Sequence, residues 1–164
     1  MQDAMPVQYM DAIRQRYEKL GYEPYRWFEA DTAPEMVPLK KEVPQCRLGV
    51  LTTSGAYVAG QVAYHYKDDN SLRAIPKATP AESLRFAHIT ENYLVSSRKD
   101  PNCTIPVDAL RALEADGAVG EIAENIYSCM GGIYSQRRVR EELIPALEEQ
   151  FREQDVDAVL LVPM

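Results

Sequence analysis

Clustered positive charge is the first thing that this sequence lacks. Its 18 Lys and Arg are outnumbered by 25 Asp and Glu, for a formal net charge of −7. No basic run is longer than a pair such as Lys40-Lys41 or Arg137-Arg138. Because nucleic acids are bound by clustered cations, we expect no nucleic-acid partner.

Long apolar runs are also missing, and we expect no targeting leader. No window approaches the ~20 apolar residues that a membrane span needs. The first five residues, Met1–Met5, have neither the basic region nor the apolar region of a signal peptide. We therefore expect a cytoplasmic protein with no membrane partner.

Cysteine is scarce. The three cysteines, Cys46, Cys103 and Cys129, are scattered and lack CxxC spacing. This pattern indicates reduced thiols rather than a disulfide framework, and we predict no metal site. The glycines of Gly131-Gly132 are not followed by the third glycine of a GxGxxG motif, so a dinucleotide site is not supported.

What the sequence does contain is a globular composition with a strand at its end. Hydrophobic residues make up 46% of the 164 residues and charged residues 26%, which is typical of a single globular domain. Residues 156–162 are nearly all apolar and follow a charged helical pattern, Leu143 to Arg152. Such a run predicts a parallel strand covered on both faces.

Residues 1–46 differ in character from the rest. A helix is predicted over Met5–Leu20, with one buried face that serves core packing or a dimer contact. That face comprises Met10, Ile13, Tyr17 and Leu20. Dense prolines exclude a regular element over residues 22–43. We expect an arm that wraps the domain or a neighbouring subunit, anchored by Tyr25, Trp27 and Phe28.

Residues 47–164 alternate strand and helix patterns. Strands are predicted at 47–53, 71–75 (a short edge strand), 84–89, 120–128 and 156–162. One helix starts with Pro106 at its first position and buries Val107, Leu110 and Leu113. Another is capped by Ser135, and Pro145 must kink it or divide it. The order predicts a three-layer α/β fold with a mostly parallel sheet and crossover helices, incomplete at its C-terminus.

Three turns converge at the carboxyl rim of this sheet, where ligands bind in open α/β folds. They are Ser54-Gly55, Met130-Gly131-Gly132 and whatever follows Met164. Backbone amides in the first turn could receive an anion, although such turns are often only turns. The Gly pair indicates a close approach of the backbone or a positive φ.

Two side chains are candidates to join this rim. His88 ends a predicted buried strand and is either a hydrogen-bonded packing residue or a site residue. Cys103 precedes a helix N-terminus, an environment that lowers the pKa of a thiol; the alternative is that it is a small buried residue.

Several segments together resemble one family. They are Leu51-Thr52-Thr53-Ser54-Gly55, Arg73-Ala74-Ile75-Pro76, Thr79, His88, Tyr93, Asp100-Pro101-Asn102-Cys103, Ile105-Pro106-Val107-Asp108, Met130-Gly131-Gly132 and Asp157-Ala158-Val159-Leu160-Leu161. From about Leu48 to Met164 the chain is similar to selenoprotein B of the glycine, sarcosine and betaine reductases, and to its counterpart in D-proline reductase.

The resemblance implies reductive cleavage of a C–N bond in a small amino acid or amine. The reactive selenocysteine, or cysteine, is implied just beyond Met164, where an in-frame UGA codon could have been read as stop. The chain would then hold no cofactor of its own, and a partner subunit would carry a pyruvoyl group. Cys103 and His88 are candidates near the catalytic site, and the Ser54-Gly55 and Met130-Gly131-Gly132 turns would bind substrate.

Two alternatives remain open from the residues alone. One is a non-catalytic binding or accessory subunit for a small ligand or partner protein, and the other is a thiol enzyme that uses Cys103. A final strand at the edge of the sheet would also favour a homo-oligomer.

Overall fold

The computed structural model describes residues 8–24 and 28–164, and the chain divides into two units, residues 1–36 and 37–164. The first unit contains α1 (Tyr9–Lys19), which ends before Gly21 at a φ of +80°. No residue of α1 is buried, so the prediction that its apolar face packs in the core is wrong, while the dimer contact stays a prediction. An amphipathic helix buries its apolar stripe only against another element. The described residues of this unit form no other element.

The proline-rich arm is irregular, as predicted. Between α1 and the short 3-10 helix Val43–Gln45, the described residues form no helix or strand. The side chain of Phe28 is exposed. Tyr25 and Trp27 lie outside the described residues.

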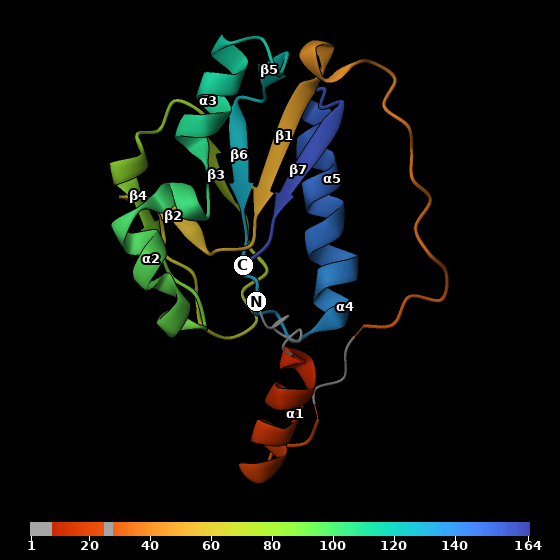
Figure 1. Ribbon diagram of the computed structural model, residues 1–164, viewed down its shortest axis with the longest axis vertical. Coiled ribbons are helices and arrows are strands. Elements are labelled where there is room, and N and C mark those ends of the chain that lie inside the picture. Colours follow the sequence, from red (N-terminus) through yellow and green to blue (C-terminus); the bar gives the residue numbers. More distant parts are fainter. Residues whose placement is uncertain (1–7, 25–27) are drawn as a thin grey trace, which may run out of the picture. The chain divides into compact units, whose positions relative to one another are not determined.

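The second unit is built on a five-stranded sheet around β1 (Arg47–Thr52). On one side, β1 pairs in parallel with β7 (Ala158–Val162). On the other side it pairs in parallel with β5 (Glu121–Ile122) and β6 (Asn125–Ser128). At the far edge, β3 (Arg73–Pro76) runs antiparallel to β6. The mostly parallel sheet is therefore confirmed (Figure 1).

The predicted strand over residues 120–128 is two strands. The chain changes partner at Ala123-Glu124, where the Ala123 amide donates to the Leu48 carbonyl at 2.9 Å and the Glu124 carbonyl accepts the Lys77 amide at 2.8 Å. The predicted strand over 84–89 is also shorter, since β4 spans Leu84–Phe86 and pairs with β2 (Ala56–Val58) in a separate two-stranded sheet. His88 therefore lies two residues beyond the strand that was expected to end at it.

Helices cover the two faces of the main sheet (Figure 1). The elements on one side include α3 (Val107–Ala115) and, beside the small sheet, α2 (Leu94–Lys99). Pro106 is the N-cap of α3 rather than its first residue, and Leu113 is exposed rather than buried. The core on this side is formed by side chains that include Val50, Leu110, Ile122 and Ile126.

The other face packs against one long helical segment. It comprises α4 (Gln136–Arg138), a π-helical turn (Val139–Leu143) and α5 (Ile144–Glu153). Ser135 caps this segment as predicted. The break that was expected at Pro145 takes the form of the π-helical turn that ends at Leu143. Its buried face meets the sheet through Leu143, Leu147, Tyr127 and Cys129.

The final strand is only partly covered. β7 is parallel to β1 as predicted, but Val159, Leu160 and Leu161 are exposed because β7 is an edge strand. No helix in the described part of the chain is long and apolar enough to cross a membrane.

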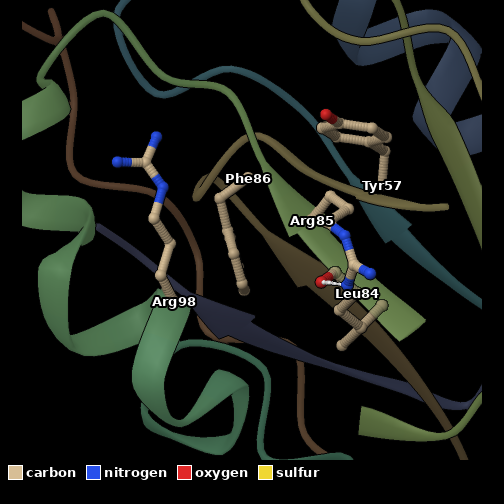
Figure 2. A pocket seen from close by; sticks show the side chains of 5 residues that line it. All are labelled: Tyr57, Leu84, Arg85, Phe86 and Arg98. Carbon is tan, nitrogen blue, oxygen red and sulfur yellow. Dashed lines mark hydrogen bonds between the residues drawn. The ribbon is translucent and has the colours of Figure 1, made fainter. Parts of the chain in front are cut away.

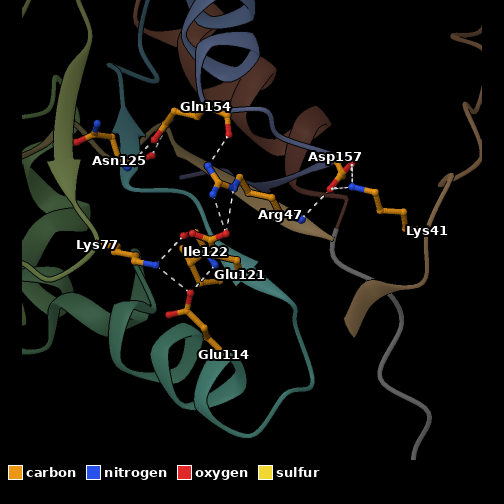
Figure 3. A network of polar contacts seen from close by, with 9 residues as sticks. All are labelled: Lys41, Arg47, Lys77, Glu114, Glu121, Ile122, Asn125, Gln154 and Asp157. Carbon is orange, nitrogen blue, oxygen red and sulfur yellow. Dashed lines mark hydrogen bonds and ion pairs between the residues drawn. The ribbon is translucent and has the colours of Figure 1, made fainter. Parts of the chain in front are cut away.

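Polar contacts join the strands at their amino ends (Figure 3). The Asp157 carboxylate accepts the Arg47 amide at 2.9 Å and the Lys41 ammonium at 2.8 Å. The Arg47 guanidinium pairs with Glu121 at 2.7 Å and donates to the Gln154 carbonyl at 3.1 Å. The carboxyl ends of the strands form the opposite rim of the sheet.

Candidate functional site

The predicted rim exists, and the backbone builds most of it. The arrowheads of β1, β6 and β7 point to the same end of the sheet, beside the C-terminus of the chain (Figure 1). Ser54 and Met130 form an antiparallel bridge across the rim, and the Gly55 amide donates to the Cys129 carbonyl at 3.0 Å. The first two predicted turns are thus in direct contact.

Ser54 and Met130 face inward rather than into a ligand site. Their exposed fractions are 0% and 1%. The Ser54 hydroxyl lies 2.9 Å from Thr52 Oγ1, which is 3.1 Å from the Thr104 carbonyl oxygen. Because the whole of each residue is buried, neither offers an accessible atom to a ligand, and both support the rim from inside.

The last residue of the chain lies at the same rim. The Met164 amide donates to Thr53 Oγ1 at 2.9 Å, and the Thr53 amide donates to the Val162 carbonyl at 3.2 Å. A Cβ on Gly131 would lie 3.2 Å from the Met164 carbonyl oxygen. The carboxyl end of β7 is thereby held between the Thr53 and Gly131 segments.

His88 joins this group and is only 3% exposed. Its Nδ1 lies 3.1 Å from the Thr90 amide nitrogen and 2.6 Å from Thr90 Oγ1, and its Nε2 lies 3.2 Å from the Gly131 amide nitrogen. Burial lowers the pKa of the imidazole, against the opposing effects of a hydrogen bond to the Thr53 backbone and of the Glu91 charge. The buried ring is thus biased toward its neutral form.

The glycines of the rim make room for the His88-Ile89 segment. A Cβ on Gly55 would lie 2.1 Å from the Ala87 carbonyl oxygen, and one on Gly132 would lie 2.2 Å from Ile89 Cγ2. Gly55 has a φ of +64°, whereas Gly131 and Gly132 have no positive φ. The close approach predicted for the Gly pair is therefore its actual role.

Cys103 lies apart from these residues. It lies in the segment between α2 and α3 with an exposed side chain, and its Sγ is 3.9 Å from Oγ of Ser97 in α2. In the described part of the chain, no side-chain interaction joins it to His88 or Gly131. Cys46 and Cys129 are buried, and burial raises the pKa of the Cys129 thiol to about 11.

Two rim residues, Thr53 and Thr90, were not predicted. Thr90 carries a recognisable signal, because a hydroxyl residue two positions after a histidine can reach back to its Nδ1. Thr53 carries no such local signal, because it joins the rim through a hydrogen bond with Met164, which is distant in the sequence.

A cavity of about 270 Å³ lies elsewhere, between the small sheet and α2 (Figure 2). It is lined by Tyr57, Leu84, Arg85, Phe86 and Arg98. Arg98 pairs with Glu91 at 2.6 Å, and Arg85 donates to the Leu84 carbonyl at 2.7 Å. Its arginines are thus occupied by partners within the chain. Among the described residues, no group of three His, Cys, Asp or Glu side chains could hold a metal ion.

Comparison with known families now identifies the chain. Residues 77–163, more than half of its length, match the family model described as glycine/sarcosine/betaine reductase selenoprotein B. This chain belongs to that family. The selenoprotein B match includes His88, Gly131-Gly132 and β7, whereas Ser54-Gly55 lies outside it.

One curated relative of this selenoprotein B family chain is D-proline reductase subunit gamma of Acetoanaerobium sticklandii. The two are 30% identical over 129 residues, which cover 78% of this chain and 52% of the relative. The chain therefore spans about half the length of the relative that it matches. No solved structure matches it.

Proposed function

We propose that this chain is a component of a reductase that cleaves the C–N bond of glycine, a methylated glycine or D-proline. Membership of the selenoprotein B family is the observation that carries the proposal. The relative named as a subunit of D-proline reductase supports the proline-type substrate and the need for partner subunits.

The reactive residue is proposed to follow Met164 directly. The geometry of the rim supports this placement. The Met164 amide donates to Thr53, and the Met164 carbonyl lies close to the exposed Gly131. A residue joined to that carbonyl would start from the crevice where open α/β sheets bind ligands. A selenocysteine or cysteine there would supply a soft nucleophile for the carbon next to the amine.

The chain's own residues have simpler tasks in this proposal. The Gly131-Gly132 turn forms a backbone wall of the substrate site, and the buried Ser54-Gly55 turn supports it from inside. His88 lies beneath it and is only 3% exposed. Substrate activation is assigned to a pyruvoyl group on a partner subunit, in line with the family resemblance. Cys103 has no comparable position, because its thiol lies in the segment between α2 and α3.

Two measurements test the proposal. Sequencing the native gene past the Met164 codon should show a UGA codon, or a Cys codon, followed by an open frame. A UAA or UAG codon would refute the placement of the nucleophile. The complex purified from its source should then release amine from glycine, sarcosine or betaine, or open the ring of D-proline, with a dithiol as the two-electron reductant. A complex that reduces none of these substrates would favour the accessory-subunit hypothesis.

A further inference from the structure

A loop over residues 66–71 holds the chain just after the Gly131-Gly132 turn. In this loop, the Asp68 carboxylate accepts the Tyr134 amide at 2.6 Å and the Ser135 amide at 3.0 Å, both through Oδ1. Tyr134 follows the turn with a single residue between them. One carboxylate oxygen thus fixes the backbone that leads from the rim into the helical segment.

The 66–71 loop is itself well fixed. The carboxylate of Asp69, which is 6% exposed, accepts the amides of His65 at 2.8 Å and of Ser71 at 2.9 Å. Arg138, in α4, donates to the Asp68 carbonyl at 2.5 Å. The Asp68 carboxylate is therefore presented to its two amides by a segment that is braced from within and from α4.

Asn70 attaches the same loop to the helical segment at a second place. Its side-chain oxygen accepts a hydrogen bond from Arg138, and its side-chain nitrogen donates to the Glu142 carboxylate at 2.7 Å. These contacts join side chains and do not involve the backbone beside the rim. Asn70 thus docks the loop on the helix, whereas Asp68 holds the backbone that leaves the Gly131-Gly132 turn.

The other end of the Gly131-Gly132 turn is held from the sheet. Met130 bridges to Ser54, and the Gly131 amide donates to His88 Nε2 at 3.2 Å. Gly131 itself is exposed. Two glycines have no side chains that could lock the turn, so its conformation depends on the contacts on either side of it. A wall that orients a substrate has to be held in this way.

We propose that Asp68 is a positioning residue that fixes the exit of the Gly131-Gly132 turn and so holds this wall of the substrate site in place. Its carboxylate acts through the amides of Tyr134 and Ser135 rather than by touching the substrate. The inference rests on the proposed function for the role of the wall, because it assigns Asp68 a part in substrate binding at that same site.

Amide hydrogen exchange on the intact chain tests the two hydrogen bonds. Amides at the start of a helix have no partner within the helix and exchange fast unless a side chain accepts them. We expect the Tyr134 and Ser135 amides to exchange roughly tenfold or more slowly than in the unfolded chain, although Tyr134 is 60% exposed. Exchange of both amides at the unfolded rate would overturn the proposal.

Two substitutions separate the carboxylate from the backbone of Asp68. The φ of Asp68 is +50°, which Asn tolerates and Gly adopts freely. Asp68→Asn keeps a side-chain oxygen, so the NMR resonances of Gly131 and Gly132 should stay in place. Asp68→Gly removes the acceptor without straining the backbone, so these resonances should shift and the slow exchange of Tyr134 and Ser135 should be lost. Unchanged glycine resonances in Asp68→Gly would contradict the proposal.

Glu142→Ala is the matched control, because it removes the contact with Asn70 and leaves the Asp68 carboxylate in place. We expect it to lower the free energy of unfolding while the Gly131 and Gly132 resonances remain unchanged. If it moves those resonances as far as Asp68→Gly does, docking of the whole loop controls the turn, and the role given to Asp68 is refuted.

Kinetics of the reductase complex connect the turn with the substrate. Asp68→Gly should raise the KM for D-proline by roughly tenfold with little change in kcat, because a displaced wall weakens substrate binding. Asp68→Asn should restore the KM of the wild type. A lower kcat at an unchanged KM would mean that Asp68 only stabilises the fold, and the proposal would fail. If Asp68→Gly displaces the turn as expected but the wild-type complex reduces no substrate, the proposed function alone is refuted.

Discussion

The ring of Phe151 occupies the space that a side chain on Gly49 would need. A Cβ on Gly49 would lie 2.8 Å from both Cδ1 and Cε1 of that ring. Tyr127 packs edge-on against the same ring, with centroids 5.5 Å apart. The glycine in β1 thus sets how closely α5 can approach the sheet.

Gly49→Ala is therefore expected to destabilise the fold by ~1–3 kcal/mol, the usual range for overpacking a core. Urea unfolding would measure the change. Phe151→Leu in the same chain should recover part of the loss, because a smaller side chain clears the new methyl group. Strictly additive effects of the two changes would show that the contact does not limit the packing of α5.

The three thiols should differ in their reaction with iodoacetamide. Cys103 is exposed, whereas Cys46 and Cys129 are buried. With a pKa of about 11, the Cys129 thiol is ionised in only about one molecule in a thousand at pH 8. Mass spectrometry after a short treatment at pH 8 should find Cys103 modified first, and the unfolded chain in urea, where all three react, is the control. Rapid labelling of Cys129 in the folded chain would contradict its placement.

His88 should make the stability depend on pH. Burial lowers the pKa of its imidazole below the 6.5 of an unfolded chain. Between the two pKa values the unfolded state binds more protons, so stability rises with pH in that window. The contribution is complete above pH 6.5 and is lost as the pH falls from there through the folded pKa.

The test compares the wild type with His88→Gln, whose amide cannot titrate in this range. The unfolding free energy of the wild type relative to that of His88→Gln should be lower at pH 5 than at pH 8. A pH-independent difference would mean that burial does not shift this imidazole. Glu91, which acts on His88 in the opposite direction, is common to both proteins.

Glu114 should contribute more to the stability of the fold than its partial exposure suggests. Its carboxylate accepts the Ile122 amide at 2.8 Å and the Lys77 ammonium at 2.9 Å, so it joins α3 to β5 (Figure 3). The Ile122 amide is the main cause of the lowered pKa of this carboxyl group. The stability that Glu114 contributes is thus present above the ordinary pKa of 4.5 and is lost as the pH falls from there through the lower pKa of the folded state.

Glu114→Gln is expected to destabilise the fold by ~1–2 kcal/mol, because both partners lose a charged acceptor. Thermal unfolding at pH 7 would measure it. Glu149→Gln, at an exposed position of α5, is the matched control and should leave the melting temperature unchanged. Equal changes in melting temperature for the two substitutions would show that Glu114 contributes no more to stability than an exposed glutamate.

Local sequence patterns predicted the main sheet and the rim because strand periodicity and small-residue turns are determined by neighbouring residues. β1, β7 and the Met130-Gly131-Gly132 turn lie where those patterns placed them. The patterns failed where the outcome depends on distant partners. The apolar face predicted for α1 is exposed, and the strand predicted over 120–128 is interrupted at Ala123-Glu124, where the Glu124 carbonyl bonds to the Lys77 amide. Thr53 was missed for the same reason, since its hydroxyl acts on Met164.

The pairing of β1 with β7 also bears on the order in which the protein can form. Arg47 and Asp157, which are joined by a hydrogen bond beside these strands, are 110 positions apart in the chain. During synthesis, β1 leaves the ribosome long before its longest partner strand exists. Until residues 158–162 have been synthesised, the edge of β1 that pairs with β7 has unpaired backbone groups. We expect the nascent chain to be a client of chaperones, since such non-local pairing is slow and aggregation-exposed.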